Sequence, residues 1–494
     1  MLQFLFKCVW IFGEINDILK AGRPQAGAAK GEAMKYDVLI IGGGPAAIFA
    51  AYEFVLKYPQ LKVVMLEAGN AIEKRFCPLA AKKVDHCINC NPCSIMRGFG
   101  GAGAFSDGKY NFTTEFGGWL NEYLPEDKVI ELIDYVDELN CRHGAPGEYF
   151  TTKNSKIGIQ ALKYDLHLLN AKVRHLGTEN NLIIMENIHK FLQDKIEIRC
   201  NTTVEEICRQ EDGSFRLELD KGASLECSYL IAAPGRAGAE WYTEQCRKMG
   251  LDFINNQVDI GVRVEVPAEV FKHITDEVYE AKILYRTQLY NDVVRTFCMN
   301  PYGYVVAENT DGIITVNGHS FRDPKLHSKN TNFALLVSSK FTEPFHEPLQ
   351  YGKRIASFSN MLGGGVLVQR FGDLVKGRRT NEKRMLKSFC KPTLSATPGD
   401  LSLVLPKRHL DDIIEMIYAL DKIAPGMANA DTLLYGVEVK FYSARLELDS
   451  NLETKVPNMF AVGDGAGITR GLSQASASGV WAARVIGRRA TENK

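Results

Sequence analysis

The chain carries no excess charge of either sign. Its 494 residues include 59 Lys and Arg against 59 Asp and Glu. That balance gives no case for nucleic acid or an anionic membrane surface as a partner. The densest basic stretch, residues 369–391, is interpreted as a solvated face or loop. The alternative is a site for an anionic substrate or a cofactor phosphate. A function in nucleic-acid modification would have this stretch as its only support in the sequence.

The sequence also lacks a convincing secretion signal, a membrane-spanning run, a long repeat and a low-complexity tract. The start, "MLQFLFKCVWIFGEINDILK", is too short and too charged to cross a bilayer, and no basic segment precedes it. We therefore expect a cytoplasmic protein with no membrane partner. Met34 is expected to be the natural start, so residues 1–33 would be a disordered or over-predicted extension. Twelve cysteines then indicate a reducing compartment rather than a disulfide framework.

A dinucleotide-binding turn is present near the start of the folded sequence. "YDVLIIGGGPAAIFAAYEFVLKY" predicts a buried strand, a glycine turn and a helix, and Gly42, Gly44 and Ala47 fit the spacing G-x-G-x-x-G/A. The helix N-terminus offers N–H groups and a positive dipole end to phosphate. The next strand, "KVVMLEA", ends in Glu67, at the spacing of an acid that binds a ribose 2′-OH. A glycine turn that binds nothing is the alternative.

Further patterns follow in a defined order. A helix is predicted from Pro125 to Gly144, and alternation on both sides of a turn at Asp212–Gly213 predicts a β-meander. Residues 252–447 are mixed in pattern and contain no second strand–GxGxxG–helix unit. "NMFAVGDGAGITRGLSQASASG" near the C-terminus predicts a strand, a loop and a helix of small residues.

This order resembles the glutathione-reductase-like, two-dinucleotide-binding superfamily of FAD proteins. Within it, the cysteine cluster, "GFGGAGAFSDGK" and "VGDGAGITRGLSQASASG" are similar to a family of largely uncharacterised FAD-dependent dehydrogenases. The resemblance implies an α/β fold: a Rossmann-like FAD-binding domain with a parallel sheet and a β-meander, and an inserted mixed α+β substrate domain. The expected divisions are the extension 1–33, an FAD-binding segment 34–251 with a helical insert near 111–165, the substrate or cap domain 252–447, and a C-terminal FAD-binding segment 448–494.

The same resemblance implies positions that bind one non-covalent FAD. Glu67 would hold the adenosine ribose, Val204 would contact adenine through its backbone, and Asp464 would bind the ribitol chain. Pro234 stands where the family usually has threonine, so that hydroxyl contact is missing. The full set of expected cofactor-binding residues is Gly42, Gly44, Pro45, Ala46, Ala47, Glu67, Ala68, Gly100, Gly101, Ala102, Gly103, Ser106, Val204, Ala233, Gly235, Gly463, Asp464, Leu472, Ser473 and Gln474.

Four cysteines precede the glycine-rich loop 98–103. Cys77, Cys87, Cys90 and Cys93 include a C-x2-C-x2-C core with the iron–sulfur spacing of bacterial ferredoxins. They could hold a [4Fe–4S] cluster or Zn²⁺, act as a redox dithiol, or simply be packed or free. His86 is a substitute ligand in the first case. A four-ligand site predicts that the Cys77 sulfur lies within a few ångströms of the other three.

The sequence therefore predicts an FAD-dependent oxidoreductase, with hydride exchanged between flavin N5 and a small organic substrate. Arg470 is the candidate for holding an anionic substrate or steadying charge near the flavin, and Lys109 and Asp107 are further catalytic candidates. One alternative is a C=C reductase of unsaturated acids, with Lys109 or Tyr110 as proton donor. Another is a non-catalytic electron-transfer flavoprotein that uses the cysteines. The electron donor could be a ferredoxin-like protein or transiently bound NAD(P)H.

Overall fold

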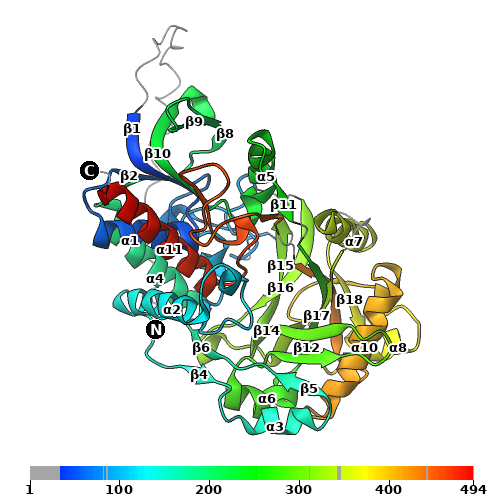
Figure 1. Cartoon of the computed structure of the whole chain (residues 1–494). Coiled ribbons are helices and arrows are strands. Elements are labelled where there is room, and N and C mark those ends of the chain that lie inside the picture. Colours follow the sequence, from blue (N-terminus) through cyan, green and yellow to red (C-terminus); the bar gives the residue numbers. More distant parts are fainter. Residues whose placement is uncertain are drawn as a thin grey trace, which may run out of the picture. The chain divides into compact units, whose positions relative to one another are not determined.

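The computed structural model describes residues 34–81, 83–84, 87–88, 90–254, 256–310, 312–341, 347–440 and 443–492 (Figure 1). Residues 35–494 form one compact unit. The expected extension 1–33 and the substitute ligand His86 lie outside the described residues.

The first sheet carries the dinucleotide turn. Its strand order is β7-β2-β1-β10-β9-β8, and β22 pairs with β10. Pairing is parallel for β1 with β2, β2 with β7 and β10 with β22, and antiparallel along β8, β9 and β10. The predicted parallel sheet and β-meander are therefore both confirmed. These strands are β1 (Met34–Ile41), β2 (Val63–Leu66), β7 (Glu197–Arg199), β8 (Val204–Arg209), β9 (Phe215–Leu219), β10 (Ser224–Ala232) and β22 (Met459–Ala461).

Two helices with small residues lie side by side against this sheet. The helix α1 (Pro45–Lys57) follows β1, and α11 (Leu472–Glu492) follows β22 (Figure 1). A Cβ on Gly479 would stand 1.9 Å from the carbonyl oxygen of Ala46, so only glycine lets the helices approach this closely. The remaining helices of this part are α2 (Glu126–Arg142), as the sequence predicts, α4 (Thr178–Gln193) and α5 (Ala239–Lys248).

The second sheet is mixed and has its own apolar core. Its strand order is β19-β18-β20-β12-β17-β14-β13-β5, and β12 is buried along nearly its whole length. The strands are β5 (Leu166–Leu168), β12 (Val258–Pro267), β13 (Ile283–Arg286), β14 (Val293–Asn300), β17 (Asn330–Ser339), β18 (Leu367–Arg370), β19 (Thr397–Pro398) and β20 (Leu433–Lys440). The helices around it are α3 (Lys156–Leu162), α6 (Ala268–Val278), α7 (Pro348–Gly363), α8 (Phe371–Val375), α9 (Glu382–Leu386) and α10 (Lys407–Asp421).

Three small sheets complete the described strands. The β15–β16 hairpin stands beside the second sheet (Figure 1). The strands are β3 (Lys109–Asn111), β4 (Phe150–Thr151) and β6 (Lys172–His175) in one sheet, β11 (Phe253–Ile254) and β21 (Arg445–Leu446) in another, and β15 (Tyr304–Thr310) and β16 (Ile313–His319) in the third.

One stretch joins a different sheet from the one that the sequence suggests. The prediction places the helical insert near 111–165 in the first FAD-binding segment. The structure pairs β5, just beyond that insert, with β13 of the second sheet, and α3 packs against β5. A three-residue strand carries no sequence signal for a partner more than a hundred residues away. The expected α/β class with an additional mixed α+β part is confirmed, while the exact domain boundaries stay a prediction.

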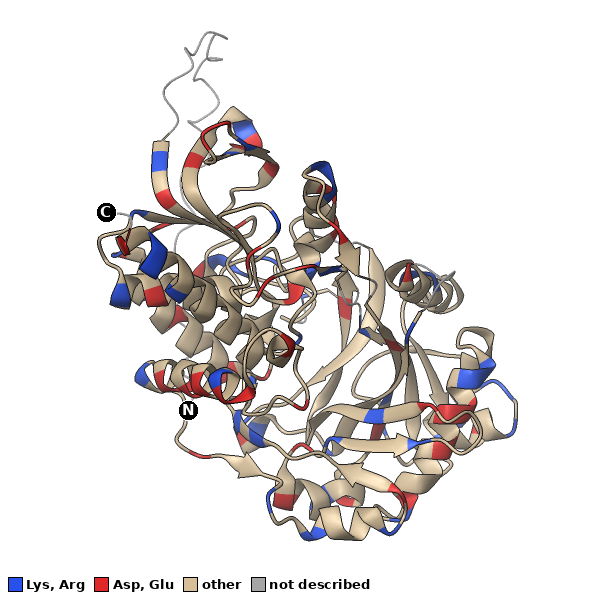
Figure 2. Ribbon diagram, in the orientation of Figure 1, with Lys and Arg blue, Asp and Glu red and all other residues tan. Residues whose placement is uncertain are grey.

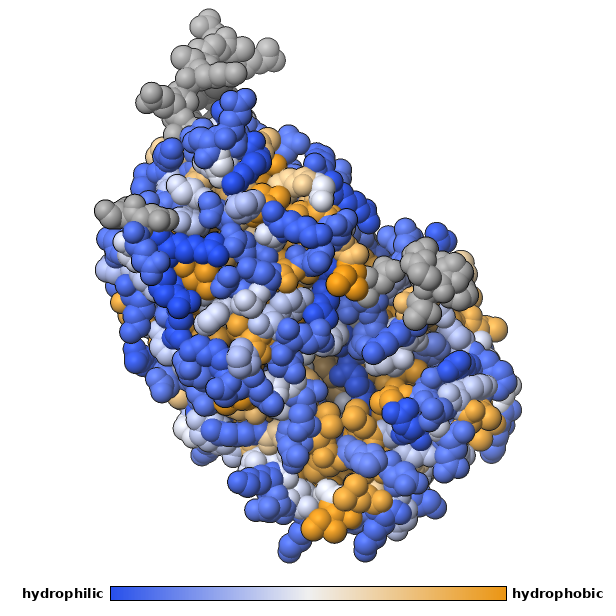
Figure 3. All heavy atoms as spheres, in the orientation of Figure 1, coloured by the Kyte–Doolittle hydropathy of each residue, from blue (hydrophilic) through white to orange (hydrophobic). Residues whose placement is uncertain are grey.

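In the view drawn in Figures 2 and 3, neither charge nor hydropathy forms one dominant patch. Positive and negative residues are interspersed over both sheets and their helices (Figure 2). On the face drawn in Figure 3, hydrophilic residues predominate and the hydrophobic ones form separate patches. Among the described residues, no helix combines the length and apolarity that a bilayer crossing requires.

Candidate functional site

One large cavity is lined by residues of both main sheets. Its volume is about 1110 Å³, above the roughly 300–1,000 Å³ of typical small-molecule pockets. One wall is the glycine turn after β1, with the ends of β10 and β22. The opposite wall comes from β14, the end of β20 and the β15–β16 hairpin. The space is large enough for a cofactor and a second small molecule together.

The turn after β1 is built for close backbone contact. Gly42 has a φ of +101°, and a Cβ there would stand 2.1 Å from the carbonyl oxygen of Ala233. Gly44 differs, because a Cβ there would meet only the Cα of Gly101, at 4.0 Å. No side chain caps the N-terminus of α1, and Gly44, Pro45 and Ala46 at that end line the cavity, so this helix end is suited to bind an anion. These features fit the pyrophosphate of a dinucleotide.

The glycine-rich loop 98–103 packs against that turn. Gly100 N donates a hydrogen bond to the carbonyl of Gly43 at 2.7 Å, and a Cβ on Gly101 would stand 3.0 Å from the Cα of Gly44. The glycines therefore serve loop-to-loop packing as well as the cavity wall. Gly101, Ala102 and Gly103 line the cavity, whereas Gly100 does not.

Arg75, which the sequence analysis missed, organises this loop. Its buried guanidinium donates hydrogen bonds to four backbone carbonyls at 2.8–2.9 Å: those of Ser94, Ile95, Phe99 and Gly101. It also stacks over the ring of Phe105, 4.7 Å from the centroid. Burial lowers the pKa of Arg75 to about 10, with Glu67 opposing the shift. A buried arginine that satisfies carbonyls from four residues fixes the course of the chain there. No local motif marks such a residue.

Glu67 ties three glycine turns together. Its carboxylate accepts hydrogen bonds from the N–H groups of Gly43 at 2.6 Å, Gly69 at 2.8 Å and Gly98 at 2.8 Å. It also lines the cavity, at the end of β2. The residue therefore shapes the dinucleotide turn directly. Its expected contact with a ribose hydroxyl stays a prediction.

Asp464 and the start of α11 belong to the same wall of the cavity as the glycine turn. The Asp464 carboxylate accepts a hydrogen bond from Thr469 Oγ1 at 2.8 Å. Burial raises the pKa of Asp464, and Arg236 opposes that rise. Both Asp464 and Leu472, the first residue of α11, line the cavity. The carboxylate can accept hydrogen bonds from a polyol chain. The positive end of the helix can stabilise a negative group near that chain.

Most of the expected cofactor positions line this cavity. These are Gly42, Gly44, Pro45, Ala46, Glu67, Ala68, Gly101, Ala102, Gly103, Ser106, Val204, Ala233, Gly235, Gly463, Asp464 and Leu472. Ala47, Gly100, Ser473 and Gln474 are buried and do not line the cavity. Ala47 is fully buried in the packing of α1, and Gln474 hydrogen-bonds the backbone of Leu120 and Phe116.

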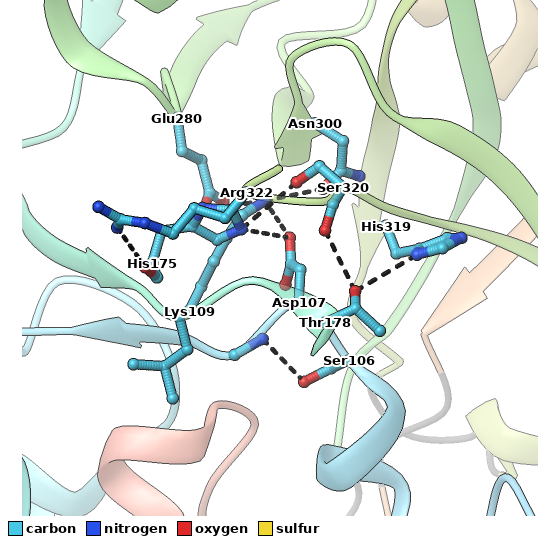
Figure 4. A network of polar contacts seen from close by, with 12 residues as sticks. Ser106, Asp107, Lys109, His175, Thr178, Glu280, Asn300, His319, Ser320 and Arg322 are labelled. Carbon is cyan, nitrogen blue, oxygen red and sulfur yellow. Dashed lines mark hydrogen bonds and ion pairs between the residues drawn. The ribbon is translucent and has the colours of Figure 1, made fainter. Parts of the chain in front are cut away.

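The three catalytic candidates, Arg470, Lys109 and Asp107, also line the cavity. Lys109 is the centre of a buried polar network (Figure 4). Its ammonium lies 2.9 Å from Asp107 Oδ2 and 3.5 Å from Glu280 Oε2, and it donates to Met299 O at 2.5 Å and Asn300 Oδ1 at 2.9 Å. The network therefore links β3, next to the first sheet, with β14 of the second.

The protonation of this network follows from its charges. Burial alone would lower the pKa of Lys109, but Asp107, Cys298 and Glu280 outweigh burial and raise it. Burial would raise the pKa of Glu280, but Lys109 and Lys282 lower it to about 2. Lys109 therefore stays protonated at neutral pH, with four oxygen acceptors around its three N–H groups. That arrangement suits a positioning role better than proton donation. Tyr110, the other proposed donor, is buried, and burial raises its pKa to about 12.

A second buried group in this network is histidine. His175 Nε2 lies 3.1 Å from the hydroxyl of Tyr279, and that hydroxyl lies 3.0 Å from Ser320 Oγ. Burial lowers the pKa of His175 to about 4, although Asp107 opposes the shift. His175 is therefore neutral near pH 7.

The cysteines do not gather as a metal site in the described part of the chain. Cys77 lines the cavity, whereas Cys87, Cys90 and Cys93 do not. Asn309 Nδ2 approaches the sulfur of Cys87 at 3.5 Å. Among the described residues, no group of three or more His, Cys, Asp or Glu side chains is arranged to hold a metal ion. The donor set thus does not fit a cluster or Zn²⁺ in this geometry, and a metal at these cysteines remains unconfirmed.

The cations of the second wall were not found from the sequence. Lys282, Arg295 and Lys440 line the cavity, but they come from three strands or strand ends and belong to no motif. The only usable signal is alternation: Arg295 and Phe297 are two residues apart in β14 and therefore face the same side. The basic stretch 369–391 contributes no residue to the described wall. Its basic side chains are exposed except for Arg370 and Arg384, which are half-buried. Arg370 pairs with Asp431, and the exposed Arg378 pairs with buried Asp373.

Two family models match the chain. One describes the C-terminal domain of FAD-dependent proteins and matches residues 257–441. The other describes glucose inhibited division protein A and matches residues 393–494. Together they place the chain in the FAD-dependent oxidoreductase superfamily, while the narrower dehydrogenase family stays a prediction. No curated protein matches the chain.

Three solved structures that match the chain are distant from it in sequence. A mutant of PqsL from P. aeruginosa is 11% identical with a TM-score of 0.41, over 93% of this chain and 88% of PqsL. The halogenase PltM is 12% identical with a TM-score of 0.41, over 93% and 70% of the two chains. A geranylgeranyl bacteriochlorophyll reductase-like protein from Thermoplasma acidophilum is 13% identical with a TM-score of 0.40, over 93% and 80%. These scores are low, and the superfamily assignment rests on the two family models.

Proposed function

We propose that this FAD-dependent oxidoreductase exchanges hydride between the N5 position of bound FAD and a small organic substrate. One observation supports the proposal most directly. The dinucleotide turn of the first sheet and the charged face of the second sheet line the same cavity. A cofactor on one wall and a substrate on the other therefore share one space. The cofactor supplies the redox chemistry, and the chain supplies binding, orientation and electrostatics.

The residues of the first wall have distinct binding roles in this proposal. Gly44 and the first-turn N–H groups of α1 hold the pyrophosphate. Glu67 orders the turn and binds the adenosine ribose, and Asp464 binds the ribitol chain. The positive end of α11 stabilises negative charge near Leu472.

The second wall positions the substrate. Lys109, which pairs with Asp107 and Glu280, connects β3 with β14. Phe116, Trp119 and Phe297 contribute apolar surface that limits water. The electron donor in this proposal is transiently bound NAD(P)H or a ferredoxin-like protein. The cysteines take no part in the proposed reaction.

Gly44→Val tests the cofactor site without disturbing the fold. Gly44 has a φ of −80°, and its Cβ direction is open, so the backbone accepts a side chain. That side chain stands at the cavity wall, where the pyrophosphate belongs. We expect wild-type protein to be yellow and to release FAD on denaturation, and the Gly44→Val protein to be colourless with an unchanged melting temperature.

Gly147→Val is the matched control, because Gly147 is exposed and nothing lies within 4 Å of its added Cβ. It should retain full FAD content. Wild-type protein that stays colourless and takes up no FAD on reconstitution would refute the proposed function.

A further inference from the structure

Four cations stand close together on the substrate side of the cavity. The Lys282 ammonium, the Arg295 guanidinium and the Lys440 ammonium lie 4.6, 5.0 and 5.5 Å from the ring centroid of Phe297. Arg470 stacks over Trp119, 4.5 Å from its ring. Lys282 also lies 4.5 Å from the ring of Phe116. All of these side chains line the same cavity.

The carboxylates near these cations are each shared. Glu438 lies 2.7 Å from Lys440 and 3.3 Å from Arg263, and both Glu438 and Arg263 are fully buried. Asp259 pairs with Arg295 and lies 3.5 Å from Arg470. Among the described side chains around Phe297, the positive groups named here thus outnumber these two carboxylates.

Two further acidic groups do not remove this excess. Glu280 lies 2.8 Å from Lys282 and also faces Lys109. Burial opposes charge on Glu308, but Arg236 and Lys440 outweigh burial and lower its pKa. Glu308 therefore has its own cationic neighbours, and Lys440 is shared once more.

Because these cations are buried, their excess of positive charge costs free energy. Lys282 and Lys440 are buried, 5% and 8% exposed, yet both reach the cavity. Burial lowers the pKa of Arg470 to about 8, with Asp259 opposing and Arg295 adding to the shift. Buried cations of this kind are stabilised by an anion that enters with its own charge.

We infer that the cavity takes an organic carboxylate as substrate, with its carboxylate held among Lys282, Arg295 and Lys440 and its apolar body against Phe297 and Phe116. This inference rests on the proposed function, because it names the substrate class of that site. The rings next to the cations favour a planar or unsaturated acid over a compact inorganic anion. Charge-assisted hydrogen bonds from lysine and arginine give the carboxylate its orientation.

The test uses FAD-loaded protein and three probes: benzoate, its neutral isostere benzamide, and sulfate. Calorimetry measures binding, and the flavin absorbance difference spectrum reports whether the probe reaches the cofactor's surroundings. Benzoate should bind at least about tenfold more tightly than benzamide. Equal binding of the two, or sulfate binding as tightly as benzoate, would overturn the carboxylate assignment.

Lys440→Met removes one cation but leaves Glu438 paired with Arg263. It should weaken benzoate binding by about tenfold to a hundredfold, with FAD content unchanged. Lys440→Arg, which keeps the charge, should retain most of the binding. The control Lys387→Met makes the same charge change at an exposed residue away from the described wall, and should leave benzoate binding unaltered. Unchanged benzoate affinity in the Lys440→Met protein would overturn the inference.

The two proposals fail in different ways. If the protein binds no FAD, the proposed function falls. Benzoate binding to the FAD-free chain, sensitive to Lys440→Met, would then still support the anion site. If FAD is bound but benzoate is not preferred over benzamide, the proposed function stands and this inference falls.

Discussion

The two walls of the cavity are built in opposite ways. The wall after β1 offers backbone N–H groups and glycines, and its carboxylate Glu67 accepts hydrogen bonds from backbone N–H groups. The wall on β14 and β20 offers long charged side chains and aromatic rings. Backbone N–H groups bind the phosphates that all dinucleotides have in common. A wall made of side chains can bind a different ligand after amino-acid substitutions. In the proposed function, the first wall binds the cofactor and the second wall determines which substrate is bound.

The largest effect should come from filling the tightest part of the backbone wall. Gly42→Val places a branched side chain 2.1 Å from the carbonyl oxygen of Ala233, at a φ of +101° that such residues avoid. We expect a loss of about 4 kcal/mol or more in the free energy of unfolding, together with loss of FAD. Urea denaturation of the variant measures this. A variant as stable as the Gly44→Val protein would show that the turn can relax, which contradicts the rigid geometry.

The next effect concerns the side-chain wall and its buried ion pair. Glu438→Ala leaves the fully buried Arg263 without this carboxylate and removes the partner of Lys440. Removing one partner of a buried pair costs about 3–5 kcal/mol. We expect that loss in the free energy of unfolding, measured in urea, with FAD content preserved in the folded fraction. A loss below about 1 kcal/mol would mean that water or relaxation compensates Arg263.

Sequence order specifies the backbone wall well and the side-chain wall poorly. Gly42, Gly44 and Glu67 lie within one β-α-β unit, so short-range order fixes their arrangement. Lys440 comes next to Asp259 only through the register of β12 with β20, and Arg295 comes beside Leu284 only through β13 with β14. Register between distant strands depends on packing of the whole sheet and leaves no local signal.

The same contrast applies to single residues. Arg470 was found because it lies in the conspicuous loop before α11. Arg75 was missed because its acceptors are backbone carbonyls, which every sequence has. The cysteine spacing suggests a ligand set, but spacing alone does not make the sulfurs converge, and no metal-holding group forms among the described residues.

A smaller effect is expected from pH. Burial lowers the pKa of both His175 and His409 to about 4, from an ordinary 6.5, so the unfolded chain binds more protons than the folded chain between those values. The stabilisation is complete above pH 6.5 and is lost progressively as pH falls toward 4. Each histidine contributes at most about 1.4 kcal/mol per pH unit in that window.

Urea midpoints at pH 7 and pH 5 measure this pH dependence. His175→Gln, which keeps a hydrogen-bonding group for Tyr279, should reduce the drop in stability between the two pH values. The exposed His167 supplies the control variant His167→Gln, which should leave the drop unchanged. A His175→Gln protein with the full wild-type drop would show that His175 is not the titrating group.

The smallest effect is expected at the cysteine stretch, residues 77–93, in which Cys77, Leu79 and Ala80 are the described residues that line the cavity. Cys90 is exposed and belongs to no metal-holding group in the described chain. Cys90→Ser should therefore change the free energy of unfolding by no more than about 0.5 kcal/mol, as for other surface substitutions, and should leave FAD content intact. Cys77→Ser is the informative partner, because it changes a side chain at the cavity wall and should shift the flavin spectrum without unfolding the protein. Iron and zinc analysis of anaerobically purified wild-type and Cys90→Ser protein completes the experiment. Metal present in the wild type and lost on Cys90→Ser would mean that the four sulfurs do converge in solution, and the cysteine stretch would then become a third functional part of the cavity.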